Sequence, residues 1–564
     1  MQPARCRPTR PGRALRPAVA VLAVGLMALV TAAACSGADA DPPATEGDPT
    51  EPLLEPDTER EADEGPSTLR WAIGEPDAIV PPLARDPDGH RVVDALFDGL
   101  IALDDEGRPE PLVADSWRSD EQALAWTFFL DRNARFHDGT PVTSEDVRTS
   151  WQAGIRDGEQ PPHLGDVIGY DEFARGETDS LEGLSTPNRW TVQVLLDRPR
   201  ADFPALLAHP ALAPVPADRW EHEPEAFARD PLGNGAFELA EPWSPGEFLR
   251  LRAADAALLG DGPTELVFRV TDPVTGYVAF QQGRVDVATV PRSALGDALD
   301  VFGELSPNGS GSGVTRTAGL EVYALGMNVM TEPFDDVRAR RALSFAVDRE
   351  RIAEIGFEGH ADLARGVASR EIPTAQSSAC PSCVHAPESA ERLFDQADLE
   401  DLTLWIDRDG GHEPIAEQLA DDLAAVGVNL EVRTLEFPDF LTAIEDGTAT
   451  LFRSGWQAEH PLLSDALIPM LHSRNADGAV ATGNPGRYRD EEIDELLDDA
   501  MAALDPEERA ELFGRAERLA LGRDMAFVPL VAPLQRLVVG ERVAGGFDPG
   551  PDGRVDLREL SLQP

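Results

Sequence analysis

The chain has 564 residues, of which 42% are hydrophobic, and its 102 acidic and 49 basic residues give a formal net charge of −53 at pH 7. Such a surface repels phosphate backbones, and no basic patch with interleaved aromatic residues occurs, which argues against nucleic-acid binding. We attribute the acidity to salt adaptation of the surface rather than to a binding function.

The first 34 residues have the layout of a signal peptide. Five arginines precede an apolar run over residues 18–34, which is short for a membrane-spanning helix of about 20 residues. The run ends in Ala32-Ala33-Ala34-Cys35, which resembles a bacterial lipobox with Ala32 in place of the usual Leu. The resemblance implies that Cys35 becomes the lipidated first residue, anchored to the outer face of the cytoplasmic membrane. Ordinary signal cleavage, with a free Cys35, is the alternative.

Residues 35–67 would then comprise the lipid attachment and a tether. Residues 41–67 are rich in Pro, Glu and Asp with few large apolar side chains, so this segment is expected to be disordered and self-repelling. The remainder, about 500 residues, is long enough for two or three domains with cores of their own.

Beyond the tether, the hydrophobic pattern predicts alternating strands and helices. In chain order, we expect a strand at 68–73, a helix at 92–100, strands at 124–130 and 190–196, a short helix at 201–208 and a strand at 402–406. A helical stripe from Ile415 to Val426 and a strand at 430–434 follow. With the strand at 402–406 they predict a parallel βαβ unit. Asp505 and Pro506 are expected to cap a helix that continues to about Leu521.

Residues 109–151 are the most patterned stretch. The apolar run Leu124–Leu130 predicts a buried strand, and Gly139 supplies a residue that tolerates positive φ in the following turn. Thr143, with Asp146 three residues later, resembles a capping box with Asp in place of Glu, and it predicts the start of a helix.

The amino-acid sequence of this stretch resembles a family signature. Residues 111–117 spell P-L-x-A-x-S-W, residues 126–130 W-T-F-x-L, and residues 136–147 F-H-D-G-T-P-V-T-x-E-D-V. These residues are similar to the signature sequence of the solute-binding proteins of the peptide/nickel class, family 5, which serve ABC importers. The resemblance implies an α/β, two-lobed periplasmic-binding-protein-like fold of type II, hinge-connected, in the large cluster with an extra side domain.

A second match lies about 200 residues downstream. Residues 320–328 and 334–352 resemble a second family signature, in which an Asn and a "P-F-x-D-x-R" turn lead into a helix. Residues 274–287 resemble the family's helix-to-strand step. The implied domains are a first lobe at 68–319, which includes a side domain at about 96–210, a second lobe at 320–525, and a return to the first lobe at 526–564. Ala526–Val531 is expected to be the returning strand.

The resemblance also indicates ligand-binding residues. Arg453-Ser454-Gly455-Trp456-Gln457-Ala458-Glu459-His460 is similar to the cleft segment "R-x-G-W-x-x-D-Y" of peptide binders. By position, Glu459 would pair with the ammonium group of a peptide, Trp456 would be an apolar wall, and Arg453 would meet an anion. His460 lies beside them, and Asp465 is an alternative acid. The competing interpretation makes Trp456 a core residue and Glu459 a surface carboxylate.

Cys380-Pro381-Ser382-Cys383 is a C-x-x-C motif within a loop-like run. A small structural disulfide is the preferred interpretation. Redox chemistry would need the motif at a strand-to-helix junction, and zinc would need two ligands beyond the cysteines, with only His385 near. Both remain alternatives.

No P-loop, H-E-x-x-H, dinucleotide fingerprint or Ser/His/Asp arrangement occurs, so we expect no enzyme, no cofactor and no metal site. The expected function is an extracytoplasmic substrate-binding lipoprotein, monomeric, that captures an oligopeptide-like solute and docks on ABC permease subunits. A binder of a nickel-type metal chelate and a non-transport surface lipoprotein for sensing or partner binding are the alternatives.

Overall fold

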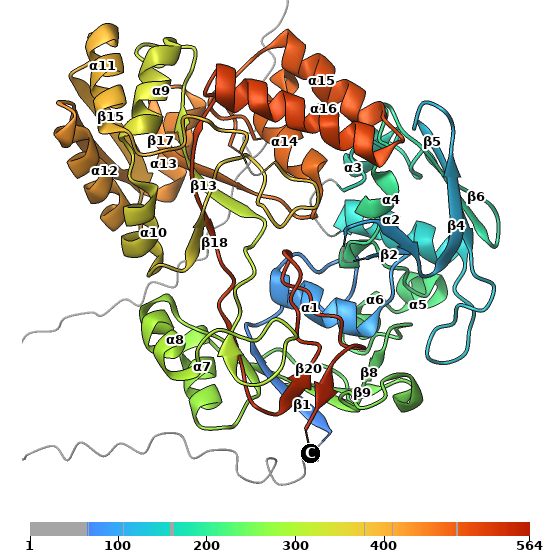
Figure 1. Cartoon of the computed structure of the whole chain (residues 1–564). Helices are drawn as coiled ribbons and strands as arrows, with labels where there is room; N and C mark the ends of the chain where they lie inside the picture. The colour runs from blue at the N-terminus through green and yellow to red at the C-terminus, as the bar shows by residue number, and fades with distance from the viewer. Residues whose placement is uncertain are drawn as a thin grey trace, which may run out of the picture. The chain divides into compact units, whose positions relative to one another are not determined.

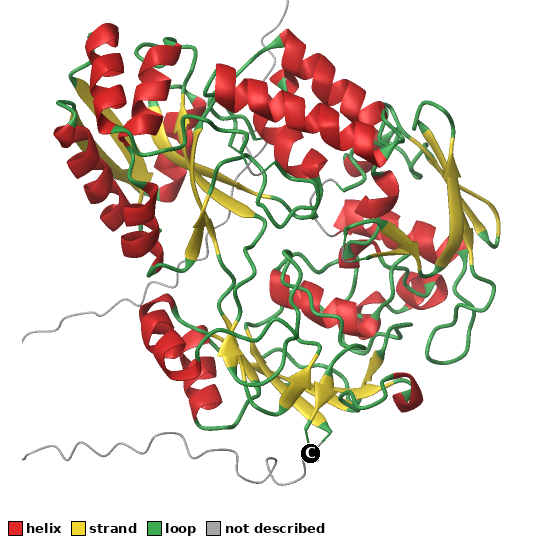
Figure 2. Ribbon diagram, in the orientation of Figure 1, coloured by secondary structure: helices red, strands yellow, loops and turns green. Residues whose placement is uncertain are grey.

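The computed structural model describes Gly65 and residues 67–563, apart from residues 105, 158–162, 247, 377, 409 and 481–482. The predicted signal peptide, Cys35 and nearly all of the tether therefore lie outside the described residues. Within those residues, no helix is long and apolar enough to cross a membrane. Strands and helices alternate along the described chain (Figures 1 and 2).

A seven-stranded sheet forms the centre of the first lobe, in the order β12-β19-β11-β1-β10-β9-β8. Its strands are β1 (Thr68–Ile73), β8 (Phe237–Leu239), β9 (Leu249–Ala253), β10 (Glu265–Val270), β11 (Val287–Thr289), β12 (Gly313–Val314) and β19 (Leu537–Val539). β1 is parallel to β10 and β11, with Trp71 opposite Phe268. Trp71 and Ala72 belong to different core clusters, as expected for neighbours on opposite faces of a sheet.

The helices of this lobe are α1 (Pro87–Leu96), α7 (Pro273–Gln281) and α8 (Leu295–Phe302). α1 begins five residues before the predicted start at Val92. The reason is local, because Asp86 accepts a hydrogen bond from Gly89 N–H at 2.6 Å and Pro87 occupies the first turn. The helix also ends four residues early, since Phe97 is extended.

A four-stranded sheet, in the order β4-β5-β7-β6, forms the side domain with a core of its own. Its elements are β4 (Ala114–Ser119), β5 (Ala125–Leu130), α2 (Ser144–Asp157), α3 (Tyr170–Ala174), β6 (Leu184–Asn188), β7 (Thr191–Leu195), α4 (Phe203–Leu206) and the 3₁₀ turn η2 (Pro210–Leu212). Asp146 accepts hydrogen bonds from Thr143 N–H at 2.7 Å and from Thr143 Oγ1 at 2.6 Å. The predicted cap therefore opens α2.

The rest of the first half of the chain consists of shorter elements. They are the hairpin of β2 (Ile101–Leu103) with β3 (Pro109–Pro111), α5 (Ala217–His222), α6 (Pro224–Phe227), and the 3₁₀ turns η3 (Ala256–Leu258) and η4 (Arg292–Ala294).

A six-stranded sheet, in the order β14-β18-β13-β17-β15-β16, forms the second lobe. Its strands are β13 (Glu321–Met327), β14 (Ala361–Leu363), β15 (Asp401–Asp407), β16 (Asn429–Leu435), β17 (Leu451–Gln457) and β18 (Val528–Pro533). Its helices are α9 (Val337–Ala346), α10 (Arg349–Phe357), α11 (Pro387–Ala397), α12 (Glu413–Ala425), α13 (Phe437–Glu445), α14 (Leu463–Leu471), α15 (Glu491–Ala502) and α16 (Pro506–Arg518). β15 and β16 are parallel neighbours joined by α12, so the predicted βαβ unit is confirmed. A disulfide joins Cys380 and Cys383.

The predicted return strand at 526–531 is wrong in its assignment to the first lobe. β18 pairs with β13 and β14 in the six-stranded sheet, and the chain re-enters the seven-stranded sheet only with β19. An apolar run of strand length shows that a strand is buried, but its partners depend on contacts distant in sequence. The last strands, β20 (Val543–Gly545) and β21 (Ser561–Leu562), pair with each other.

Two segments cross between the large sheets and run together. Residues 315–320 lead from β12 to β13, and residues 534–536 lead from β18 to β19. Thr315 N–H donates to Leu537 O at 2.9 Å and Gln535 N–H donates to Thr317 O at 2.9 Å. This paired crossing is the connection that a two-lobed fold needs for hinge motion.

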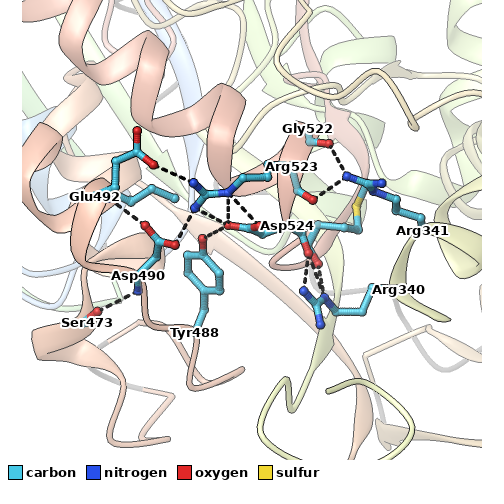
Figure 3. A network of polar contacts seen from close by, with 11 residues as sticks. Arg340, Arg341, Ser473, Tyr488, Asp490, Glu492, Gly522, Arg523 and Asp524 are labelled. Atoms are coloured by element: carbon cyan, nitrogen blue, oxygen red, sulfur yellow. Dashed lines mark hydrogen bonds and ion pairs between the residues drawn. The ribbon is translucent and has the colours of Figure 1, made fainter. Parts of the chain in front are cut away.

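A polar network ties α9 to the end of α16 within the second lobe (Figure 3). Arg340 donates to the carbonyl oxygens of Phe334, Asp524 and Met525 at 2.6–3.1 Å. Arg523 donates to the carboxylates of Asp490, Glu492 and Asp524 at 2.5–3.0 Å, and Tyr488 OH donates to Asp524 at 2.6 Å. The network holds the π-helical turn Leu519–Arg523, which precedes β18 in the chain.

Candidate functional site

The predicted ligand-binding segment lies on β17 and the loop that follows it. β17 is an inner strand, antiparallel to β13 and parallel to β15. Gly455 faces β13 so closely that a Cβ atom would lie 2.6 Å from Val322 O, which requires glycine at this position. After Gln457 the chain leaves the sheet and turns into α14, so Glu459 and His460 lie at the end of the strand.

Arg453 is held by an ion pair. Its Nε lies 2.5 Å from Asp407 Oδ1, and its guanidinium lies over the ring of Phe440 at 5.1 Å from the centroid. Asp407 also lies 3.3 Å from His412 Nε2. A ligand anion would therefore have to share Arg453 with Asp407.

Trp456 forms part of the wall of a hollow beside β17. Its Nε1–H donates to Asp465 O at 2.8 Å, which fixes the ring. The hollow has about 80 Å³ of free space and is mostly apolar. Its walls also include Phe437, Phe440 and Met470 from α13 and α14.

Asp465 shapes the loop rather than presenting a free acid. Its Oδ2 accepts hydrogen bonds from Glu459 N–H at 2.7 Å and His460 N–H at 2.8 Å, and it lies 3.2 Å from His460 Nδ1. Burial opposes ionisation of this carboxyl, but the hydrogen bonds and charge of His460 outweigh it and lower the pKa of Asp465 to about 2.

Glu459 is the segment's more accessible carboxylate. Its side chain is 42% exposed, and its Oε2 lies 3.4 Å from Nδ1 of His163 in the side domain. The surrounding burial, with the negative charge of Asp465, raises the pKa of Glu459 to about 7. A cationic partner would lower that pKa again, because it stabilises the charged form.

A histidine cluster that sequence reasoning missed lies around this carboxylate. The rings of His163 and His209 lie 4.3 Å apart, centroid to centroid, and the ring of His460 lies 5.1 Å and 5.0 Å from them. All three are buried. Burial and the neighbouring imidazoles lower the pKa values of His163 and His209 well below the usual range, which favours the neutral rings. No spacing signal could have revealed them, since they come from separate parts of the chain.

The same place is a direct contact between the second lobe and the side domain. Ser464 Oγ donates to Asp202, and Ala201 N–H donates to Met501 O at 2.8 Å. Arg200 pairs there with Asp166 at 2.9 Å and with Asp202 at 3.3 Å. The predicted residues Glu459, His460 and Asp465 therefore lie together near this contact. Trp456 and Arg453 line the hollow, where Trp456 is joined to Asp465 by a hydrogen bond and Arg453 is paired with Asp407.

Among curated proteins, the chain is 26% identical over 502 residues to the periplasmic oligopeptide-binding protein OppA of Salmonella typhimurium, covering 83% of this chain and 87% of that protein. It is 25% identical over 509 residues to the dipeptide-binding protein DppE of Bacillus subtilis, covering 86% and 90%. It is 24% identical over 496 residues to the glutathione-binding protein GsiB of Escherichia coli, covering 85% and 91%.

Among solved structures, the murein tripeptide-binding protein MppA in its unliganded open form matches with a TM-score of 0.77 at 22% identity, covering 88% of this chain and 97% of that one. The Haemophilus influenzae OppA complex with RPPGFSPFR matches with a TM-score of 0.62 at 21% identity, covering 88% and 99%. The predicted two-lobed α/β fold is thus confirmed.

The family model for bacterial extracellular solute-binding proteins, family 5, matches residues 108–478. The expectation that the chain is not an enzyme is confirmed, because this family and the relatives above are binding proteins. The chain belongs to the family 5 extracellular solute-binding proteins, as its two sequence signatures predicted.

Proposed function

We propose that this chain is the lipid-anchored solute-binding subunit of an ABC importer and that it captures an oligopeptide-like solute between its two lobes. The observation that carries the proposal is the position of Glu459, a partly exposed carboxylate where the second lobe meets the side domain. The relatives named above bind oligopeptides, dipeptides and glutathione, which supports a solute with a free amino group.

In this proposal Glu459 pairs with the ammonium group of the solute. The Trp456 hollow takes an apolar side chain, and Arg453 meets a carboxylate by sharing its guanidinium with Asp407. His460 and Asp465 hold the loop that carries Glu459. A charge-assisted hydrogen bond in a partly desolvated place is worth about 1.5–3 kcal/mol, enough to select for a free amino terminus.

The mechanism follows from the two paired crossing segments. A solute that contacts both lobes stabilises the closed arrangement, because it binds the closed arrangement more tightly than the open one. The closed protein then docks on the permease subunits. Anchoring through Cys35 keeps a monomeric binding protein near those subunits, and a Cys35→Ser variant is expected to be released from membranes on fractionation.

The test compares one tetrapeptide with its N-acetylated form by calorimetry, in the presence of a chelator. Acetylation should weaken binding to the native protein by at least about tenfold. Glu459→Gln should remove that difference, whereas Glu431→Gln, an exposed acid on β16, should keep it. A variant Glu459→Gln that still discriminates would disprove the role of this carboxylate, and failure of all peptides to bind would disprove the peptide solute.

A metal chelate is the second candidate solute. The buried histidines beside Glu459 favour it, because imidazole and carboxylate groups could contact or replace ligands of a bound metal complex.

A further inference from the structure

We propose that His163, His209 and Glu459 form a binding site for one divalent transition-metal ion of the Zn²⁺ or Ni²⁺ type. Ligand atoms of these three side chains all lie within 4.8 Å of one another. The site goes beyond the proposed capture of a peptide, and it shares Glu459 with the proposed ammonium contact.

The spacing is close to that of a metal site. Zinc binds imidazole nitrogen and carboxylate oxygen at about 2.0–2.2 Å, so two ligands of one ion lie about 3.3–3.5 Å apart. Glu459 Oε2 and His163 Nδ1 are already 3.4 Å apart. Small rotations of the side chains would bring the remaining atoms into range.

The donor set selects the class of ion. Two neutral imidazoles with one carboxylate suit Zn²⁺, Ni²⁺, Cu²⁺ and Fe²⁺, whereas Mg²⁺ and Ca²⁺ prefer oxygen ligands alone. Both histidines are buried, at 7% exposure each, so the ion would be largely shielded from water on their side. The partly exposed Glu459 would leave an open path from the surface.

Unpartnered nitrogens support a ligand at this place. Nε2 of His163 and Nε2 of His460 are buried without a hydrogen-bond partner among the residues that the structure describes. A buried polar atom normally finds a partner, because leaving it unpaired costs its desolvation. Of these two residues only His163 belongs to the proposed site, and its unpaired Nε2 is the ring nitrogen other than the Nδ1 that lies 3.4 Å from Glu459. Either nitrogen of His163 offers the ion a ligand atom.

The surrounding residues position the rings. Asp465 lies 3.2 Å from His460 Nδ1 and holds the ring of His460 beside the three proposed ligands. His209 accepts a hydrogen bond from Ala211 N–H at its Nδ1, at 3.2 Å, so the neutral ring carries its proton on Nε2. Binding of the ion at Nε2 would move that proton to Nδ1 and break this hydrogen bond. His90 packs edge-on against His209 with its own Nε2 3.1 Å from Ala84 O, so it supports the cluster rather than joining it.

The bound ion would have a structural consequence. His163 and His209 belong to the side domain and Glu459 to the second lobe, so one ion would join the two. Because Glu459 is then occupied, the ion and the ammonium group of a peptide are expected to compete.

The experiment uses the full chain, purified without a polyhistidine tag and stripped with a chelator. Zn²⁺ is titrated in the presence of a large excess of Mg²⁺, which occupies the many surface carboxylates. One Zn²⁺ per chain should bind, and His163→Gln and His209→Gln should each weaken its binding by at least about tenfold. His222→Gln, an exposed histidine on α5, should leave it unchanged.

A spectroscopic measurement on the native protein makes the test independent of variant folding. The zinc-edge X-ray absorption spectrum should show at least two imidazole ligands. A spectrum with oxygen ligands only, no ion retained in excess Mg²⁺, or unchanged affinity in both histidine variants would overturn the proposal. The peptide role of Glu459 is tested separately, since free and acetylated peptides are compared with metal removed.

Discussion

Two polar regions of this molecule differ in how fully the nitrogen atoms of their central side chains are hydrogen-bonded. In the network of Figure 3, the Nε and both terminal nitrogens of Arg340 and of Arg523 all donate to a carbonyl or carboxylate oxygen. In the histidine cluster, Nε2 of His163 and of His460 has no partner among the described residues. Paired nitrogens such as those of Arg340 stabilise the fold, whereas the unpaired histidine nitrogens are available to a ligand.

The largest expected effect lies at Arg340, whose three side-chain nitrogens all donate hydrogen bonds. Arg340→Met should lower the free energy of unfolding by about 3–4 kcal/mol, because it leaves buried carbonyl oxygens of Phe334, Asp524 and Met525 without a donor. Arg338→Met on the same helix is the control, since Arg338 is half exposed and pairs only at the surface. Urea denaturation measures both, and equal small losses would contradict the prediction.

A buried carboxyl with two donors should respond to pH. Glu517 accepts hydrogen bonds from Val367 N–H at 2.7 Å and Ala368 N–H at 3.4 Å, and burial raises its pKa to about 7. Because this folded-state pKa exceeds the unfolded one, the folded protein holds more protons between about pH 4.5 and 7. This group's contribution is therefore full at low pH and is lost as pH rises through that window.

Glu517→Gln removes this loss. The native protein should lose stability between pH 5 and pH 8, and the variant should not. The free energy of unfolding of the variant minus that of the native protein should therefore increase between these pH values by an amount on the order of 2–3 kcal/mol, measured by denaturation at both. Glu507→Gln, in the exposed first turn of the same helix, is the matched control. Parallel pH curves for native protein and Glu517→Gln would refute the assignment.

A smaller effect is expected at the hollow. Trp456→Phe keeps the apolar wall but loses the hydrogen bond from Nε1 to Asp465 O, so unfolding should become easier by about 1 kcal/mol. Peptide affinity should fall together with it, because the loop that carries Glu459 is less well held. Unchanged stability with unchanged affinity would show that the bond is dispensable.

The smallest expected effect is in the unsaturated cluster. His163→Leu removes a buried nitrogen that has no partner among the described residues, so without metal the free energy of unfolding should change by less than about 1 kcal/mol. Stabilisation of the native protein by added Zn²⁺ should disappear in this variant. A loss as large as that of Arg340→Met would show that the cluster holds the fold, and the contrast between the two regions would fail.

Local signals determined much of the secondary structure. The apolar run Leu124–Leu130 became β5, Asp505 and Pro506 cap α16, and the pattern from residue 402 to residue 434 became a βαβ unit. These features depend on residues a few positions apart, so a linear pattern contains them. The two signatures indicated the family for the same reason, since both are contiguous.

Only the tertiary structure decided the partners. β18 joined the six-stranded sheet although we expected this strand to return to the first lobe, and Arg453 pairs with Asp407 on the neighbouring strand β15. His163, His209 and Glu459 come from separate parts of the chain and meet where the side domain contacts the second lobe. The sequence by itself therefore determined the elements and the family, and the packing of distant elements decided which side chains form a site, because such contacts leave no periodic trace in the chain.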